Sequence, residues 1–166
     1  MNKTMNIARG GLLAALTVLL IYMTNIVPTS RLTLLTVASA VIPYSILTTG
    51  ARNSFIVYGA ASALSLLLVG FRSATVAYVI FFGLYGFVKY YVEAINKIPY
   101  EIVLKLVYFN VSLFAIYMLY STLFTDSISD KLPIYLIIAG AQAVFFIYDY
   151  ALTILISYIR KRFIKA

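Results

Sequence analysis

The long apolar stretches of this chain contain ionisable side chains, among them Lys89, Lys105 and Asp149. In the hydrocarbon core of a membrane such a group costs at least about 2.5 kcal/mol, so it needs a partner of opposite charge or an escape to the interface. With a helical rise of about 1.5 Å per residue, all three positions fall at one depth. We therefore expect Asp149 to pair with Lys105 or Lys89, in a buried ion pair that holds three helices together.

The same three residues have other uses that the sequence leaves open. They could form a contact with a partner on the cytoplasmic side, or a latch that responds to protonation. Glu101 also stands four residues before Lys105, the favourable order for a pair on one helix. A proton path is disfavoured, because Asp149 is the only acid deep in an apolar stretch and no second carboxylate or histidine continues a relay.

A second set of side chains could bind a small molecule. Asn110 and Gln142 fall at a similar depth, near the opposite surface from the ionisable group. The rest of the set lies toward that surface: Tyr78, Tyr117 and Tyr120, with Arg72 or Arg31 as an anion clamp at the mouth. Apolar walls with a few convergent polar groups are typical of ligand pockets. The alternatives are hydrogen bonds between helices for the two amides, and interface anchoring for the tyrosines, of which there are 15 beside no tryptophan.

Few side chains in this chain could support enzymatic catalysis. Cysteine and histidine are both absent, which excludes disulfides, thiol chemistry, histidine metal ligands and imidazole catalysis. The sequence also contains no nucleophile elbow and no phosphate-binding glycine-rich loop. We expect no enzymatic activity, no cofactor and no metal, and any primary transport would need an ATPase from other chains.

Composition indicates that helices crossing a membrane carry these side chains. Hydrophobic residues make up 63% of the 166 residues, charged residues make up 11%, and the mean hydropathy is +0.99. Crossing a hydrocarbon core takes about 20 apolar residues, and six stretches qualify or nearly qualify. They are Gly10 to Val27, Leu32 to Thr49, Ser54 to Gly70, Ala74 to Val92, Ile98 to Phe124 and Leu132 to Ile159. We predict an all-α polytopic membrane protein with one six-helix domain over residues 1–166, whose second helix could break near Pro43.

The distribution of positive charge predicts the orientation. Of the 13 Lys and Arg residues, ten fall on the side of both termini: Lys3, Arg9, Arg52, Lys89, Lys97, Lys105, Arg160, Lys161, Arg162 and Lys165. Arg31, Arg72 and Lys131 fall on the other side. Because cytoplasmic loops carry the excess of Lys and Arg, both termini are expected in the cytoplasm of a cell membrane. The net charge of +8 then indicates anionic lipid rather than nucleic acid as its partner.

Small residues in the first stretch clear one helix face for close packing. Gly10, Gly11, Ala14 and Ala15 recur at intervals of three and four. Such patterns are common where membrane helices approach each other. The face could pack inside this chain, or it could receive a partner protein.

The run from Ala8 to Leu16, ARGGLLAAL, opens a six-span chain of 166 residues with both ends inside. In these features the chain resembles the substrate-binding S components of energy-coupling factor transporters. The resemblance implies that Gly11 and Ala15 form the face that docks on a coupling subunit, which works with two ATPases, with glycine replacing the alanine of the family pattern at the first position. It further implies capture of a small, vitamin-like solute in the outer half.

Two other classes remain open on the sequence. One is a scaffold that transports nothing, similar in size to the shape-determining MreD family of cell-envelope machines. The other is a small flippase for a lipid or a polyprenyl lipid, which should have a groove open sideways to the bilayer. A cavity between the outer halves of the last three helices would favour the solute-binding subunit over the scaffold.

Overall fold

The computed structural model describes residues 3–123 and 134–163, and within these residues the chain is helical, without strands. The elements are α1 (Lys3–Ile26), η1 (Pro28–Ser30), α2 (Arg31–Thr49), α3 (Ala51–Leu68), α4 (Ser73–Ala77), η2 (Tyr78–Phe82), α5 (Gly83–Glu93), α6 (Ile98–Leu123) and α7 (Ile134–Phe163). Because α4, η2 and α5 form one continuous helix, the described residues contain six helices long and apolar enough to cross a membrane. The chain is thus an all-helical, multi-pass membrane protein, as its composition predicts.

Several helices are longer than their apolar stretches. α1 begins at Lys3, seven residues before the stretch that starts at Gly10, so its basic first turns are also helical. The sequence leaves a break near Pro43 open, but α2 runs unbroken through this buried proline. Lys131 and Lys165, which were part of the charge count, lie outside the described residues.

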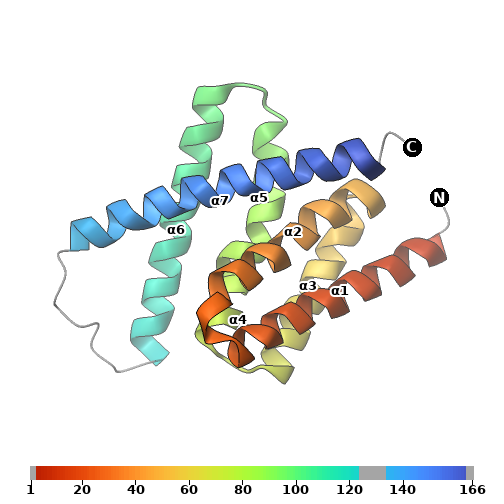
Figure 1. Ribbon diagram of the computed structural model, residues 1–166, viewed down its shortest axis with the longest axis horizontal. Coiled ribbons are helices and arrows are strands. Elements are labelled where there is room, and N and C mark those ends of the chain that lie inside the picture. The colour runs from red at the N-terminus through yellow and green to blue at the C-terminus, as the bar shows by residue number, and fades with distance from the viewer. Residues whose placement is uncertain (1–2, 124–133, 164–166) are drawn as a thin grey trace.

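The two termini lie at one end of the bundle, beside the turn between α2 and α3 (Figure 1). α7 crosses over α2, α5 and α6, and α6 runs steeply across its direction (Figure 1). With 26 and 30 residues, α6 and α7 exceed the roughly 20 residues that a perpendicular crossing needs. Long apolar helices accommodate this excess by tilting, which is consistent with their crossed arrangement.

The first three helices pack through small and hydroxyl side chains. Ala14, Val18 and Ile21 on α1 are buried, and the absent side chain of Gly10 leaves room for Val57 of α3. At the turn between α2 and α3, Gly50 takes a φ of 88°, in the region that favours glycine. Hydroxyl contacts then hold the two helices together: the Ser54 hydroxyl donates to Ser45 Oγ at 2.8 Å.

A π turn interrupts the fourth span at residues 78–82. Such turns change the backbone register and leave carbonyl oxygens without their usual helical donors. Phenol groups from two neighbouring helices supply donors here. Tyr58 of α3 donates to the Val79 carbonyl at 2.6 Å, and Tyr108 of α6 donates to the carbonyls of Ile80 and Phe81, both at 3.0 Å. The turn is therefore built into the fold by tyrosines on both sides.

Two glycines after the π turn allow close approach of other helices. A methyl group on Gly83 would lie 2.6 Å from the ring of Tyr58, and one on Gly86 would lie 2.8 Å from Cδ of Pro43. Gly59 on α3, by contrast, faces open space. At Gly86, α5 thus packs directly against Pro43 and Ile42 of α2, with no room for a side chain between the two helices.

Gly86→Ala should destabilise the protein by about 1–3 kcal/mol, because the added methyl group overlaps Pro43 and Ile42 in a packed core. Gly59→Ala is the matched control, and should leave stability unchanged or raise it by about 1 kcal/mol through helix propensity. Thermal unfolding followed by circular dichroism in detergent measures both. Equal midpoints for the two variants would contradict the close contact between α5 and α2.

Candidate functional site

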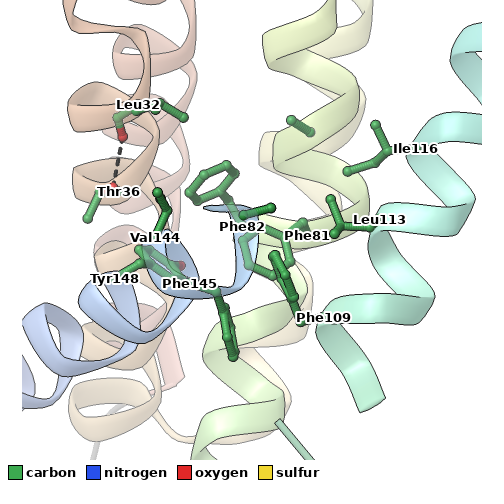
Figure 2. A pocket seen from close by; sticks show the side chains of 12 residues that line it. Leu32, Thr36, Phe81, Phe82, Phe109, Leu113, Ile116, Val144, Phe145 and Tyr148 are labelled. Carbon is green, nitrogen blue, oxygen red and sulfur yellow. Dashed lines mark hydrogen bonds between the residues drawn. The ribbon is translucent and has the colours of Figure 1, made fainter. Parts of the chain in front are cut away.

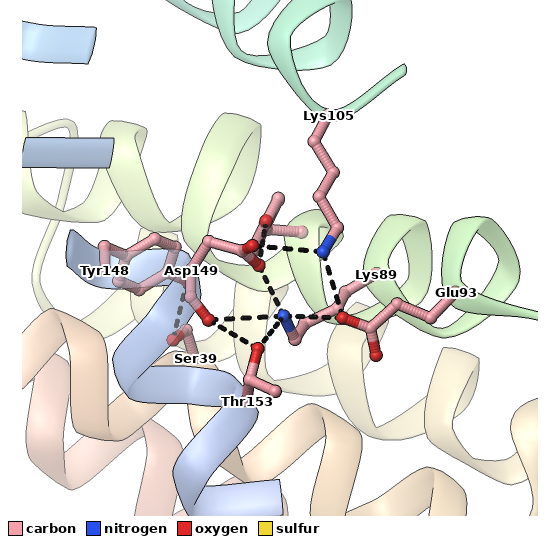
Figure 3. Close-up of polar contacts among 8 residues, drawn as sticks. Ser39, Lys89, Glu93, Lys105, Tyr148, Asp149 and Thr153 are labelled. Carbon is pink, nitrogen blue, oxygen red and sulfur yellow. Dashed lines mark hydrogen bonds and ion pairs between the residues drawn. The ribbon is translucent and has the colours of Figure 1, made fainter. Parts of the chain in front are cut away.

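Four charged side chains form a closed ring where α5, α6 and α7 meet (Figure 3). Lys89 Nζ contacts Glu93 Oε1 at 2.8 Å, and the same oxygen lies 2.9 Å from Lys105 Nζ. Lys105 Nζ continues to Asp149 Oδ2 at 3.0 Å, and Asp149 Oδ1 closes the ring by accepting from Lys89. We call these four residues the ionic ring. Charges alternate around it, and they sum to zero.

Lys89 is the most deeply buried member, with 1% of its surface exposed. Besides its two carboxylates, its ammonium group contacts Thr153 Oγ1 at 2.8 Å and the carbonyl of Asp149 at 3.2 Å, so its three protons are all in use. The buried phenol of Tyr85 donates to Asp149 Oδ1 at 2.6 Å. Such complete pairing offsets the cost of holding these charges within membrane-spanning helices.

A polar cavity of about 470 Å³ adjoins the ionic ring at the end of the bundle that carries the termini. Lys89 and Glu93 line it, together with Tyr90 and with Asn96 of the connection between α5 and α6. Glu93 has about a third of its side chain exposed, so this side of the ring opens into the polar cavity.

The sequence offered Lys89 and Lys105 as alternative partners for Asp149, and the structure has both contacts. Glu93 was missed, although it stands one helical turn after Lys89, a spacing that brings side chains together. Lys105 contacts Glu93 and Asp149. Glu101, the other acid considered for it, is not a member of the ring.

An apolar cavity of about 280 Å³ lies on the opposite side of the ring, in the half of the bundle away from the termini. Figure 2 shows the side chains that line it. It is bounded by the first turns of α2, by the π turn, by the second half of α6 and by the middle of α7. The lining residues are Leu32, Thr36, Ala77, Phe81, Phe82, Phe109, Leu113, Ile116, Ala141, Val144, Phe145 and Tyr148. The last three membrane spans therefore share one cavity with α2.

Aromatic rings make the walls of this cavity. Phe109 and Phe145 stack with their centroids 4.5 Å apart, and Phe81 of the π turn lies 5.6 Å from Phe109. Phe82 meets Tyr148 edge to face at 5.3 Å. Only two of the lining residues carry a polar side-chain atom, and none is charged. The arrangement suits binding of an apolar molecule.

The apolar cavity and the ionic ring meet on one turn of α7. Tyr148 lines the cavity and the next residue, Asp149, belongs to the ring. The ring of Tyr85, whose phenol binds Asp149, lies 5.3 Å from that of Tyr148 and 5.4 Å from that of Phe145. A rearrangement of the cavity wall would therefore reach the charged groups through direct contacts.

The side chains expected to bind a ligand are placed elsewhere. Asn110 is exposed on the outside of α6 and donates to the Leu106 carbonyl of its own helix at 2.8 Å, while Gln142 is half-buried on α7 but does not line the cavity. Tyr78 is fully buried, and its hydroxyl has no hydrogen-bond partner among the described residues, whereas Tyr117 is exposed. None of these four lines the apolar cavity.

The mouth and docking residues have their own positions. Arg72 is exposed and donates to Asn25 Oδ1 at 3.2 Å, so it joins the end of α1 to the start of the fourth span rather than facing the cavity. The side chain of Tyr120 lies outside the described part of the structure. Gly11 and Ala15 are both exposed, whereas Gly10 and Ala14 pack inward against α3. The small residues of α1 thus lie on two faces of the helix: one packs against α3, and the other, with Gly11 and Ala15, is open.

A shallow groove of about 190 Å³ runs beside the open face of α1, between α1 and α3. Gly11 lines it together with Asn6 and Ile7 of α1 and with Asn53 and Ile56 of α3.

No group of three or more acidic side chains that could hold a metal ion occurs in residues 3–123 and 134–163.

Asp149→Asn should destabilise the protein by about 3 kcal/mol, since it leaves two buried lysines with one carboxylate. Lys89→Met should cost a similar amount. The double variant retains only the neutral pair of Lys105 and Glu93, so it should be less destabilised than the sum of the two by about 1–3 kcal/mol. Thermal unfolding of the four proteins measures this coupling, with Lys97→Met at an exposed position as control; strictly additive effects would contradict a closed ring.

Comparisons of the chain with protein-family models, with characterised proteins and with solved structures found no match. Three features of the described residues bear on function: the apolar cavity, the ionic ring and the open face of α1.

Proposed function

We propose that this chain is the membrane-embedded solute-binding subunit of a transporter of the energy-coupling factor type. It captures a small molecule in the apolar cavity and docks through α1 on a coupling subunit that works with ATPases. Both termini lie in the cytoplasm of the cell membrane, and the cavity faces the outer half. The chain itself supplies binding and no catalysis.

The observation that carries the proposal is the position of the apolar cavity. A solute-binding subunit needs a cavity between its last three spans in the half away from the termini, whereas a scaffold needs none. A space of about 280 Å³ bounded by the π turn, α6 and α7 meets that requirement. Ligand sites of membrane bundles are commonly built between facing helices in this way, with apolar walls and few polar groups.

Docking on a partner is supported by the open face of α1. Gly11 has nothing within 4 Å of the position a side chain would take, and Ala15 is exposed. Small residues at this spacing allow the backbones of two membrane helices to approach closely. The inward-facing Gly10 and Ala14 already hold α3, so the outward pair is available to another protein.

A lipid-handling protein is the second candidate, and one observation favours it. Leu32 of α2 and Val144 of α7 line the cavity and are both largely exposed, at 65% and 55%. The cavity therefore has an edge between α2 and α7 through which an acyl chain could enter from the bilayer. Its lining provides no charged group for a headgroup, so solute binding remains the better-supported function.

A co-purified solute should be detectable by native mass spectrometry of the wild-type protein in detergent. Ala141→Phe places a ring in the cavity and should abolish the adduct, because Ala141 is part of the lining. Ala143→Phe on the same helix is the control: Ala143 is exposed, so the adduct should persist. An adduct with the mass of a phospholipid, or one retained in Ala141→Phe, would count against solute capture.

Gly11→Leu with Ala15→Leu should reduce recovery of the coupling subunit in a pull-down at least tenfold, because two isobutyl groups hold the partner helix away. The thermal midpoint of the isolated chain should be unchanged, since both positions are open. Ala139→Leu with Ala143→Leu repeats the substitution at exposed positions with the same spacing on α7. Equal recovery with all three proteins would remove α1 as the docking helix.

A further inference from the structure

We infer that the ligand of the apolar cavity is an uncharged compound of one or two rings that carries a hydroxyl or N–H group donating to Thr36. This inference rests on the proposed function, because it names the chemical class of the solute captured in the same cavity. Four properties of the described lining lead to it: volume, wall chemistry, hydrogen-bonding capacity and charge.

Volume limits the ligand to one or two rings. An engineered apolar cavity of roughly 150 Å³ in another protein takes a single benzene ring. The cavity here measures about 280 Å³, slightly less than twice that benchmark. A compound with the dimensions of naphthalene or indole fills it, whereas a nucleotide or a tetrapyrrole does not.

Wall chemistry favours a flat ring. Five aromatic side chains line the cavity: Phe81, Phe82, Phe109, Phe145 and Tyr148. Phe109 and Phe145 stack on each other, and Phe81 and Phe82, successive residues of the π turn, lie beside them in the wall (Figure 2). Aromatic rings gain from offset stacking and edge contacts beyond the burial of their area, and a ring ligand makes these contacts with several walls at once.

Hydrogen bonding selects a donor on the ligand. Thr36 Oγ1 already donates to the Leu32 carbonyl at 2.8 Å, and the Tyr148 hydroxyl donates to Ser39 Oγ at 2.9 Å. A hydroxyl has one proton, so both lining hydroxyls can now only accept. Tyr148 directs its oxygen toward buried Ser39, which leaves Thr36, partly exposed at the cavity, as the acceptor for the ligand.

The uncharged lining excludes an ion as the ligand of the cavity. No residue of the lining is charged, and the cations of the ionic ring are fully paired with carboxylates. An anionic or cationic group in the cavity would lose its hydration without a counter-ion, which disfavours binding strongly. The ligand is therefore neutral at the pH of the membrane surface.

Three probes that share one ring system test this class: 2-naphthol, naphthalene and the anion 2-naphthoate. Binding is measured by calorimetry with the chain in nanodiscs, and the signal of Ala77→Phe in the same lipid is subtracted to remove partition into the bilayer. Ala77 lines the cavity from α4, so the added ring occupies the site. We expect one 2-naphthol per chain, about threefold to tenfold weaker binding of naphthalene through loss of one hydrogen bond, and no measurable binding of 2-naphthoate.

Thr36→Val keeps the shape of the side chain and removes the acceptor. It should bring 2-naphthol to the affinity of naphthalene and leave naphthalene unchanged, a difference that a general loss of packing would not produce. Ala143→Phe on the exposed side of α7 should bind like the wild type. If Ala77→Phe does not fold, Ala141→Phe fills the cavity from another helix and serves as the blank.

Binding of 2-naphthoate as tight as that of 2-naphthol, or an unchanged preference for 2-naphthol in Thr36→Val, overturns the inference. If no probe binds while a native solute is still lost in Ala141→Phe, the ligand class is wrong and the solute-binding function stands. If neither a probe nor a native solute depends on the cavity, the proposed function itself fails.

Discussion

The neutral ionic ring of Lys89, Glu93, Lys105 and Asp149 is the interaction on which the crossing of α5, α6 and α7 depends. Each charge alone would cost free energy within a membrane span, and all four residues are needed to close the ring. The ring joins three helices at a single point because its members come from α5, α6 and α7. Beyond the ring, the π turn, α6 and α7 bound the apolar cavity together with α2.

The π turn adds the second constraint. It places Phe81 and Phe82 into the space that α6 and α7 leave open, and the phenols of Tyr58 and Tyr108 hold its carbonyl oxygens. Both sides of the turn are thus fixed by neighbouring helices. Tyr85, one turn further along α5, then binds Asp149 and contacts Tyr148. Cavity and ring are consequently parts of one packed layer, so occupation of the cavity has a direct route to the charged groups near the end of the bundle that carries the termini.

Sequence reasoning succeeds here where the relevant quantity is length or depth. The apolar stretches predict the six spanning helices, because a membrane of fixed thickness requires a fixed number of residues. Depth also brings Lys89, Lys105 and Asp149 together. It does not decide whether Asn110 and Gln142 face the apolar cavity, which neither of them lines, because the rise along a helix says nothing about the direction in which a side chain points around the axis. That direction is set by packing between helices, as Gly83 and Gly86 show, and the π turn has no distinct pattern in the sequence.

A density map of the chain purified from its own membrane, with the apolar cavity lined by Phe81, Phe109 and Phe145 resolved, tests the central claim most directly. The account predicts a compact, flat molecule in contact with this lining and within hydrogen-bonding distance of Thr36, together with an intact ionic ring. An acyl chain that enters between Leu32 and Val144 and continues into the bilayer would contradict it, as would side chains packed so that no space remains.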